Sequence, residues 1–333
     1  MLNGIKFWKR PLALVLASVL LMALTFVGVV EWATRELLEP TEQPLTEYTR
    51  EWVESPAAHG ISIRKATFRS GRSSYLIVEP AGEKPARRGF ILRKQLRGKG
   101  VLLEEFGVIR ADLILLHGRD GRKEGMLPIA ERFCAAGFRC LIPDLPPGGF
   151  AGNEGEGSIV FDLLTEWREG SGEPVLPCGM WGLSLGGAYA TRAAALESKA
   201  WFGMVIVNTF DQLDAVVQGQ ARRYFGFSGS WIHRAVGWNA RRRKGLDMKT
   251  IAPSDWAGQV TTPVLAVHGT DDVVVPIGRG QRLFEVFASQ DKQWLEVEGG
   301  GHDDVLVTPM PLYAAMSAWL LNQVDRSRHM TKR

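Results

Sequence analysis

A serine flanked by glycines stands where two predicted elements meet. Ser184 is the central residue of the pentapeptide GLSLG at 182–186, which follows an apolar, strand-like run at 175–181 and opens an alanine-rich, helix-like run at 187–196. A sharp turn from strand to helix lifts a serine hydroxyl clear of a sheet, where it can act as a nucleophile. Glycines two positions before and after the serine fit this turn, because side chains there would collide with the neighbouring strand and helix. The pentapeptide therefore predicts nucleophilic serine chemistry.

Groups that could activate this serine follow two later predicted strands. An apolar run at 264–269 leads to Asp271 and Asp272, and an alternating run near the C-terminus leads through three glycines to His302. A histidine can accept the serine proton, and an aspartate can hold the imidazole in the required tautomer. His302 is therefore the predicted base. Either aspartate of the pair could be the acid, and Asp211, after the preceding strand, is a further alternative.

Backbone N–H groups near the serine could bind the anion that forms when its hydroxyl attacks a carbonyl. One donor is expected at Leu185, at the start of a predicted helix whose dipole favours negative charge. The apolar run 111–116 ends in a His-Gly pair before Arg119, and we expect the second donor at Arg119. His117 and His268 occupy matching strand ends and are interpreted as structural hydrogen-bonding residues.

The rest of the chain predicts the framework for these residues. Strand-like and helix-like segments alternate from residue 111 onward, which predicts a parallel sheet with helices on both faces. Residues 61–68 and 74–79 alternate apolar and polar residues and are predicted to be antiparallel strands. The later strands are expected at 111–118, 138–144, 174–182, 202–208, 263–269 and 293–297, and the helices at 126–136, 159–168, 185–196 and 308–324.

The order serine, acid, histidine gives residues 61–324 a resemblance to α/β-hydrolases. The His-Gly turn before Arg119 and the run HGTDDVVVP at 268–276 resemble bacterial esterase-like members. The resemblance implies an α/β-hydrolase fold, with a mostly parallel central sheet, helices on both faces and a helical cap. The family's spacing to the Val-x-Pro that follows favours Asp272 as the acid.

The resemblance also implies an activity. A triad of Ser184, Asp272 and His302 would cleave a carboxylic ester, a small-molecule ester or acyl substrate, through an acyl-serine intermediate. Water is the second substrate, and no metal or organic cofactor is implied. An aminopeptidase or amidase of the same fold is the first alternative, because the same triad serves both reactions, and a non-catalytic scaffold that binds a partner or lipid is the second.

Strand–helix alternation breaks between residues 208 and 260. In the fold that the chain resembles, an insertion here lies above the site, so we interpret residues 209–260 as a helical cap that shapes substrate access. Its run RRRK at 241–244 is interpreted as a solvated face, with an anionic substrate or anionic lipid headgroups as alternatives. Its aromatic residues are interpreted as the cap's own core, with ligand contacts as the alternative; they are Tyr224, Phe225, Phe227, Trp231 and Trp238.

Residues 11–30 are twenty uncharged residues, about the length that spans a bilayer as a helix. Lys6, Lys9 and Arg10 precede them, so the positive-inside rule puts the N-terminus in the cytoplasm and the catalytic domain outside it, in the periplasm of a Gram-negative cell. A single-pass anchor is the preferred interpretation. A cleaved signal peptide and a buried core helix are the alternatives.

Composition limits the remaining possibilities. The 333 residues suffice for one large domain and an appendage, here divided into a cytoplasmic stub and anchor at 1–30, a linker at 31–60 and a hydrolase domain at 61–325. A formal net charge of +4 with dispersed cations gives no indication of nucleic-acid binding. The three cysteines show no metal-ligand spacing and are interpreted as small buried hydrophobes. The oligomeric state is not predicted.

Overall fold

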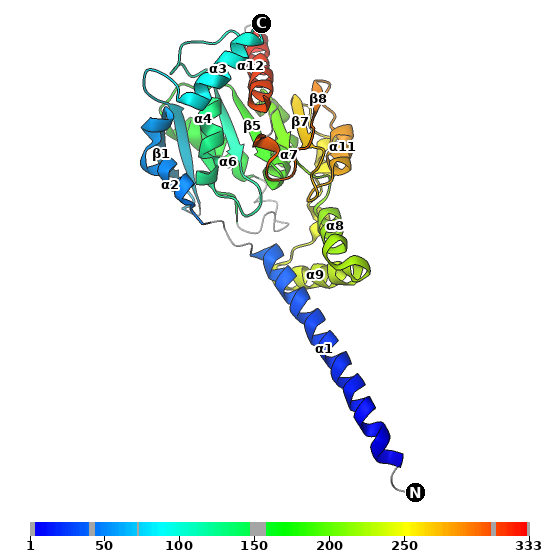
Figure 1. Cartoon of the computed structure of the whole chain (residues 1–333). Coiled ribbons are helices and arrows are strands. Elements are labelled where there is room, and N and C mark those ends of the chain that lie inside the picture. The colour runs from blue at the N-terminus through cyan, green and yellow to red at the C-terminus, as the bar shows by residue number, and fades with distance from the viewer. Residues whose placement is uncertain (1–3, 40–43, 72, 147–157, 308–310, 332–333) are drawn as a thin grey trace.

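The computed structural model describes residues 4–39, 44–71, 73–146, 158–307 and 311–331, and an eight-stranded sheet forms its centre (Figure 1). The strand order is β1-β2-β4-β3-β5-β6-β7-β8. The β1–β2 and β2–β4 pairs are antiparallel and all the others are parallel, so the predicted mostly parallel sheet is confirmed. The strands are β1 (Ile61–Thr67), β2 (Ser74–Pro80), β3 (Ala111–Leu116), β4 (Phe138–Pro143), β5 (Cys178–Leu183), β6 (Met204–Val207), β7 (Val264–Gly269) and β8 (Lys292–Val297).

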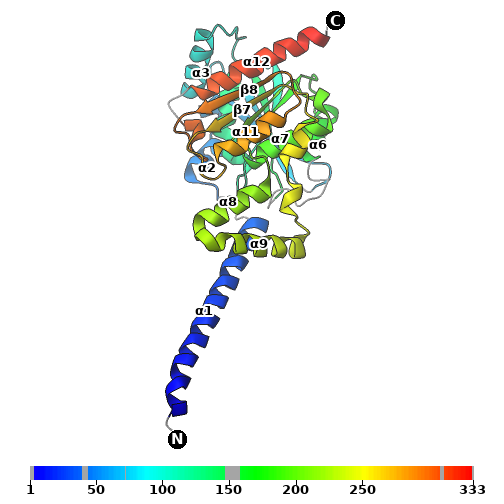
Figure 2. The ribbon, with the colours of Figure 1, turned by 90° about the vertical axis from the view of Figure 1, so that its right-hand side faces the viewer.

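Helices cover both faces of this sheet, as the alternation predicted (Figure 2). Successive residues of a strand point to opposite faces. In β3, Ile114 and Leu116 therefore pack toward α6 and α7, while Leu113 and Leu115 pack toward α3, α4 and α12. The helices are α1 (Gly4–Leu38), α2 (Glu47–Glu54), α3 (Arg87–Gly98), α4 (Leu127–Ala135), α6 (Ile159–Gly170), α7 (Leu185–Leu196), α8 (Leu213–Phe225), α9 (Gly229–Lys244), α10 (Pro253–Ala257), α11 (Ile277–Val286) and α12 (Leu312–Thr331).

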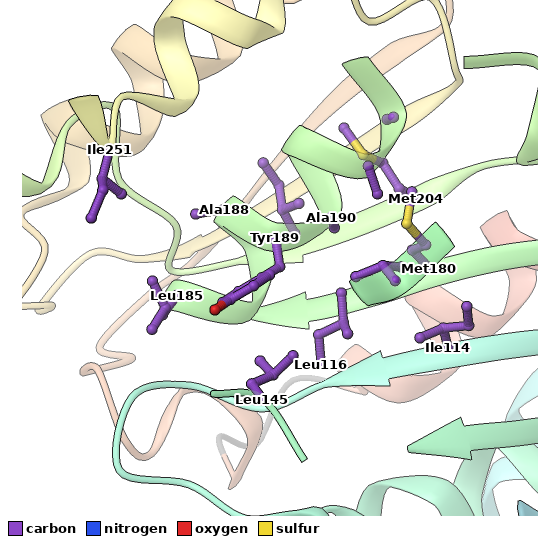
Figure 3. Packing of buried hydrophobic residues seen from close by; sticks show 14 of the residues in the cluster. Ile114, Leu116, Leu145, Met180, Leu185, Ala188, Tyr189, Ala190, Met204 and Ile251 are labelled. Carbon is purple, nitrogen blue, oxygen red and sulfur yellow. The ribbon is translucent and has the colours of Figure 1, made fainter. Parts of the chain in front are cut away.

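The helix that follows the serine lies close to the centre of the sheet. Small side chains such as Ala188 and Ala190 let α7 approach the strands, and both are fully buried. Tyr189 on the same helix lies beside Leu116 and Met180 of the neighbouring strands (Figure 3). This packing fixes the start of α7 against the carboxyl ends of β3 and β5, where the site is expected.

The first helix projects from the folded body as a long rod (Figure 1). It is the one helix in the described part of the chain that is long and apolar enough to cross a membrane. Residues 13–28 are exposed, whereas Val30, Thr34 and Leu37 are buried against the hydrolase domain. The expected boundary at residue 30 is therefore not a structural boundary, because α1 continues to Leu38 to bury these side chains.

Two helices of the insertion, α8 and α9, form a layer between the sheet domain and the exposed part of α1 (Figure 2). The helical cap is present, but α10 packs on α7 and α11 and so belongs to the body of the domain. The interpretation of the aromatic residues as the cap's core is wrong for four of the five. Tyr224, Phe227, Trp231 and Trp238 are 73%, 97%, 65% and 63% exposed, because the cap buries small and aliphatic side chains instead.

Three further segments can be compared with the sequence predictions. The helix α11 was not predicted; its pattern is short and follows directly on the acid loop. The basic stretch 80–107 contains α3 at its centre. Cys134, Cys140 and Cys178 are free and buried, which fits their interpretation as small hydrophobes.

Candidate active site

Ser184 lies at the turn between β5 and α7 in a strained backbone conformation. Its φ is 52° and its ψ is −114°, in a region that residues with a side chain rarely adopt. Its backbone N–H donates to the carbonyl of Val207 on β6, with 2.8 Å between nitrogen and oxygen. Such strain persists only where the surroundings enforce it, and it is concentrated at functional sites. The turn has the geometry that the pentapeptide predicted.

The glycines of this turn are required by close approaches of backbone to backbone. A Cβ on Gly182 would lie 2.4 Å from the carbonyl carbon of Gly186, and a Cβ on Gly186 would lie 2.1 Å from the carbonyl oxygen of Leu116. At Gly187 the nearest atom would be Oγ1 of Thr209, at 1.9 Å. The first two contacts have the steric cause expected from the sequence. The third, between α7 and the residue after Asn208, was not anticipated.

Three predicted residues form a hydrogen-bonded line at the carboxyl ends of β5, β7 and β8. Nε2 of His302 lies 3.1 Å from Oγ of Ser184, and Nδ1 of His302 lies 2.6 Å from Oδ2 of Asp272. The carboxylate can only accept, so Nδ1 donates to Asp272 and Nε2 is left to accept from the serine hydroxyl. The second oxygen of Asp272 accepts from the N–H groups of Val274 and Val275 at 2.9 and 2.7 Å.

The two alternative acids have other partners. Asp211 pairs with Arg279 and Arg282 of α11, at 3.2 and 2.8 Å. Asp271 accepts a hydrogen bond from the hydroxyl of Thr270 at 3.0 Å. Of the three candidates, only Asp272 is hydrogen-bonded to His302, and its side chain is fully buried.

The two expected anion donors border the same cavity as Ser184. Leu185 is the first residue of α7, and the first N–H groups of a helix have no acceptor within the helix. Arg119 follows β3, and its guanidinium donates to the backbone carbonyl of Glu36 in the last turns of α1. The turn before Arg119 is braced by His117, whose Nδ1 donates to Gly118 O at 2.8 Å while its Nε2 accepts from another backbone N–H.

His268 also makes contacts that fit a structural role. Its Nε2 donates to the carbonyl of Val275 at 2.8 Å, and its side chain is buried beneath the acid loop. Burial lowers the pKa of His268, which favours the neutral imidazole. A neutral ring that donates to this loop helps to hold Asp272 beside His302.

Asn208 is a residue of the site that the sequence analysis did not single out. It follows β6, is fully buried and has a φ of 48°, a conformation in which asparagine is enriched. Its Oδ1 accepts from the N–H of Gly269 at 2.9 Å, and its Nδ2 donates to the carbonyls of Gly301 and His302 at 3.0 and 3.1 Å. One side chain thus joins the end of β7 to the loop that carries the histidine. An asparagine directly after a predicted buried strand is the signal that could have indicated it.

A cavity of about 900 Å³ opens above Ser184 and His302. Its floor is formed by loops at the carboxyl ends of the strands, and its walls come from α1, α8 and α9. The part of the chain that the structure describes contains no cluster of three or more His, Cys, Asp or Glu side chains placed to hold a metal ion. The apolar part of the lining consists of Leu37, Leu183, Phe210, Val216, Val217, Phe225, Ile232, Val236 and Val274, among others.

The sheet order, the strained serine turn and the three aligned side chains define an α/β-hydrolase. The model of the alpha/beta hydrolase family matches residues 113–315, more than half of the chain, and the chain belongs to this family. The chain is therefore a hydrolase.

Known proteins similar to this chain include lipases and esterases. The thermostable monoacylglycerol lipase of Bacillus sp. (strain H-257) is 24% identical over 218 residues, which is 60% of this chain and 86% of the lipase. An esterase of Pyrococcus furiosus has a similar fold, with a TM-score of 0.58, 16% identity, and coverage of 82% of this chain and 96% of the esterase. A bacterial membrane phospholipase A also has a similar fold, with a TM-score of 0.53, 16% identity, and coverage of 94% of this chain and 99% of the phospholipase chain.

Proposed function

We propose that this chain is a membrane-anchored serine hydrolase that cleaves carboxylic esters through an acyl-serine intermediate. The single observation that carries the proposal is the hydrogen-bonded line from Ser184 through His302 to Asp272. Nε2 of His302 takes the serine proton as Oγ attacks the ester carbonyl, and the same proton then passes to the leaving alcohol. Water attacks the acyl-serine in the second half of the cycle, with His302 again as the base.

Two backbone N–H groups bind the oxyanion in this proposal. Leu185 offers its N–H from the start of α7, where the helix dipole favours negative charge. Arg119 offers the second from the turn after β3. Each such donor typically stabilises the transition state by about 3–4 kcal/mol. Asp272 stabilises the imidazolium that forms in each half-reaction and holds the ring in the productive tautomer.

An ester is the substrate class that the cavity and the sequence relative favour. The lining is mainly apolar near α8 and α9, which suits an acyl chain, and the similar Bacillus protein is a monoacylglycerol lipase. Charged side chains also border the cavity: the carboxylates of Glu36, Asp120 and Asp303 and the cations of Arg119 and Arg122. A cavity lined by both apolar and charged side chains fits a substrate with a fatty chain and a small polar headgroup.

The N-terminal helix is proposed to remain as the anchor, with the N-terminus in the cytoplasm and the catalytic domain outside it. Cleavage of a signal peptide after the apolar run would separate residues 31–38 from the first part of the helix. Trp32, Ala33 and Leu37 line the cavity, and Thr34 is fully buried, so this segment works as a wall of the site. A continuous helix that is buried at one end and exposed along residues 13–28 suits an anchor that is kept.

The proposed activity can be tested with a substrate panel. Full-length protein in lipid nanodiscs would be given p-nitrophenyl esters of increasing chain length and a matched set of aminoacyl p-nitroanilides. Hydrolysis of the esters with anilides left intact is the expected outcome. The reverse pattern would contradict the ester assignment and indicate an aminopeptidase or amidase.

The proposed anchor has a separate test. The mass and N-terminal sequence of the protein recovered from cell membranes would be compared with the full-length chain. An N-terminus beyond residue 28 would contradict the retained anchor.

A further inference from the structure

The exposed side of α9 carries tryptophans and arginines in a helical repeat. Its members are three, four and again three or four residues apart, which puts them on one side of the helix. All of them are exposed to solvent. We call this surface the α9 stripe; it consists of Trp231, Arg234, Trp238, Arg241 and Arg242.

The opposite side of α9 faces the hydrolase. Ile232, Val236 and Ala240 are buried, and the first two line the cavity above Ser184. The α9 stripe therefore points away from the active site and away from the sheet domain. Two tryptophans that are about two-thirds exposed on one helix side are unusual for a surface that only meets water, because large exposed apolar patches mark interaction sites.

Each tryptophan of the stripe lies beneath an arginine. The guanidinium carbon of Arg234 is 5.8 Å from the ring centre of Trp231, and that of Arg242 is 5.1 Å from the ring centre of Trp238. Arg241 pairs with Asp247. Among the described residues, no carboxylate forms an ion pair with Arg234 or Arg242, so both charges are available to an outside anion.

The position of α9 relates the stripe to the proposed membrane span. Figures 1 and 2 show α9 lying across α1, between the folded body and the exposed length of α1. Arg243 of α9 pairs with Glu31, and Nδ2 of Asn239 donates to Oγ1 of Thr34 at 3.4 Å. These contacts begin directly after residues 11–30, which are about 30 Å long as a helix, the thickness of a hydrocarbon core. The stripe thus lies level with the end of the span.

We propose that the α9 stripe, together with the 97% exposed Phe227, binds the anionic phospholipid headgroups of the bilayer that α1 crosses. Tryptophan rings prefer the boundary between headgroups and acyl chains, and arginines pair with lipid phosphates. The inference rests on the proposed anchor. It also narrows the substrate class, because a cap held on the bilayer keeps the cavity beside esters that reside in the membrane.

The location of the stripe can be measured without reference to catalysis. A nitroxide label would be attached at Trp238→Cys in the full-length protein, in nanodiscs of phosphatidylcholine with and without phosphatidylglycerol; the native cysteines are buried. The matched control label is Phe90→Cys, at a 60% exposed position of α3, and this helix lies on the side of the body away from α1 (Figure 1). We expect the label at 238, and not the label at 90, to be shielded from a water-soluble relaxing agent when phosphatidylglycerol is present.

Two results would overturn the inference. Equal water accessibility of both labels in the anionic nanodiscs would contradict the proposed contact between the α9 stripe and lipid. Dipolar broadening between labels at 238 in nanodiscs that hold two chains would assign the stripe to a second copy instead. The accessibility of the labels does not depend on catalysis. It can therefore be measured even if the protein does not hydrolyse esters, so failure of the proposed function and failure of the proposed lipid contact can be told apart.

The charges of the stripe have a second test. The variant Arg234→Gln/Arg242→Gln would be compared with Lys94→Gln/Arg97→Gln on α3, which removes the same charge from an exposed surface away from the anchor. The measured quantity is the ratio of monoacylglycerol hydrolysis in anionic nanodiscs to hydrolysis of soluble p-nitrophenyl butyrate. We expect the stripe variant to lower this ratio about tenfold and the control to leave it unchanged. An equal ratio in both variants would contradict the role of Arg234 and Arg242.

Discussion

The turn that carries Ser184 and the cap that covers it are built on opposite principles. Around the turn, backbone meets backbone so closely that Gly182 and Gly186 admit no side chain, and Ser184 is held in a strained conformation. In the cap, large aromatic rings and arginines are exposed. A turn that must place one hydroxyl to within a fraction of an ångström needs rigidity from its whole surroundings, whereas a surface that meets lipid needs exposed rings and charges.

The largest effect, on ester turnover, is expected at the proposed nucleophile in the rigid serine turn. Ser184→Ala removes the proposed nucleophile and should lower ester turnover roughly 10⁴-fold or more, while the fold is retained because the side chain is small. The measurements are p-nitrophenyl ester hydrolysis and covalent labelling by a fluorophosphonate probe. Ser171→Ala, at a half-buried position directly after α6, is the matched control and should keep both. Labelling that persists in Ser184→Ala would refute the assignment of the nucleophile.

The next prediction compares the effect on stability of adding one methyl group in the serine turn and in the cap. Gly186→Ala puts a Cβ 2.1 Å from a backbone oxygen of β3, and we expect it to destabilise the fold by more than about 4 kcal/mol. Gly219→Ala, on an exposed side of α8 in the cap, has no described atom within 4 Å of the added carbon and should stabilise by up to about 1 kcal/mol. Chemical denaturation of both variants tests the contrast, and equal stabilities would refute it.

A third comparison concerns the two halves of α1. Deleting residues 1–28 removes the exposed residues 13–28 and leaves Val30, Thr34 and Leu37 in place, so turnover of soluble esters should be retained. Deleting residues 1–39 also removes Val30 and Leu37 from the core and takes a wall from the cavity, so stability should fall by about 3 kcal/mol and soluble-ester turnover should fall as well. Thermal unfolding and p-nitrophenyl butyrate assays of the two truncations decide this. Similar behaviour of both would mean that residues 29–39 are only a tether.

The smallest effect is expected at the residue that links the acid and histidine loops. Asn208→Gly keeps the backbone at positive φ but removes three hydrogen bonds, which should lower stability by about 2 kcal/mol. Because His302 would be less well positioned, kcat should fall about tenfold with KM little changed. The variant Asn208→Asp keeps the acceptor for the N–H of Gly269. Its stability and kcat should lie between those of Asn208→Gly and those of the wild-type protein. A loss of stability without any change in kcat would leave Asn208 a purely structural residue.

The parts of the site that depend on short-range sequence could be predicted. The glycines around Ser184 are forced by contacts within one turn and its neighbouring strand, so the pentapeptide carries the necessary information. The place of His302, and of an acid on the loop after residue 269, follows from the predicted strands, since the carboxyl ends of parallel strands meet at one edge. The choice of Asp272 over Asp271 and Asp211 depended on the resemblance to α/β-hydrolases. The structure puts the side chains of these three residues in hydrogen-bonding contact.

The parts that depend on long-range contacts could not be predicted. Asn208 contacts residues about 60 and 90 positions later in the chain, and its own neighbours in sequence give no sign of this. The cap aromatics were assigned to a core because an apolar side chain on a helix does not say which side is covered. The continuation of α1 to Leu38 was missed for a related reason: polar residues after residue 30 suggested a linker, but residues three and four apart on one side of the helix are buried.

The hydrogen bond from Arg119 to the carbonyl of Glu36 ties the turn that is proposed to bind the oxyanion to the end of α1. A spanning helix changes its tilt with the thickness of the bilayer around it. If α1 is such a helix, its tilt acts on the residue that is proposed to stabilise the oxyanion, and lipid chain length becomes a variable of the reaction rate. Equal kcat for a soluble ester in thin and thick nanodiscs would show that the two ends of this bond move independently.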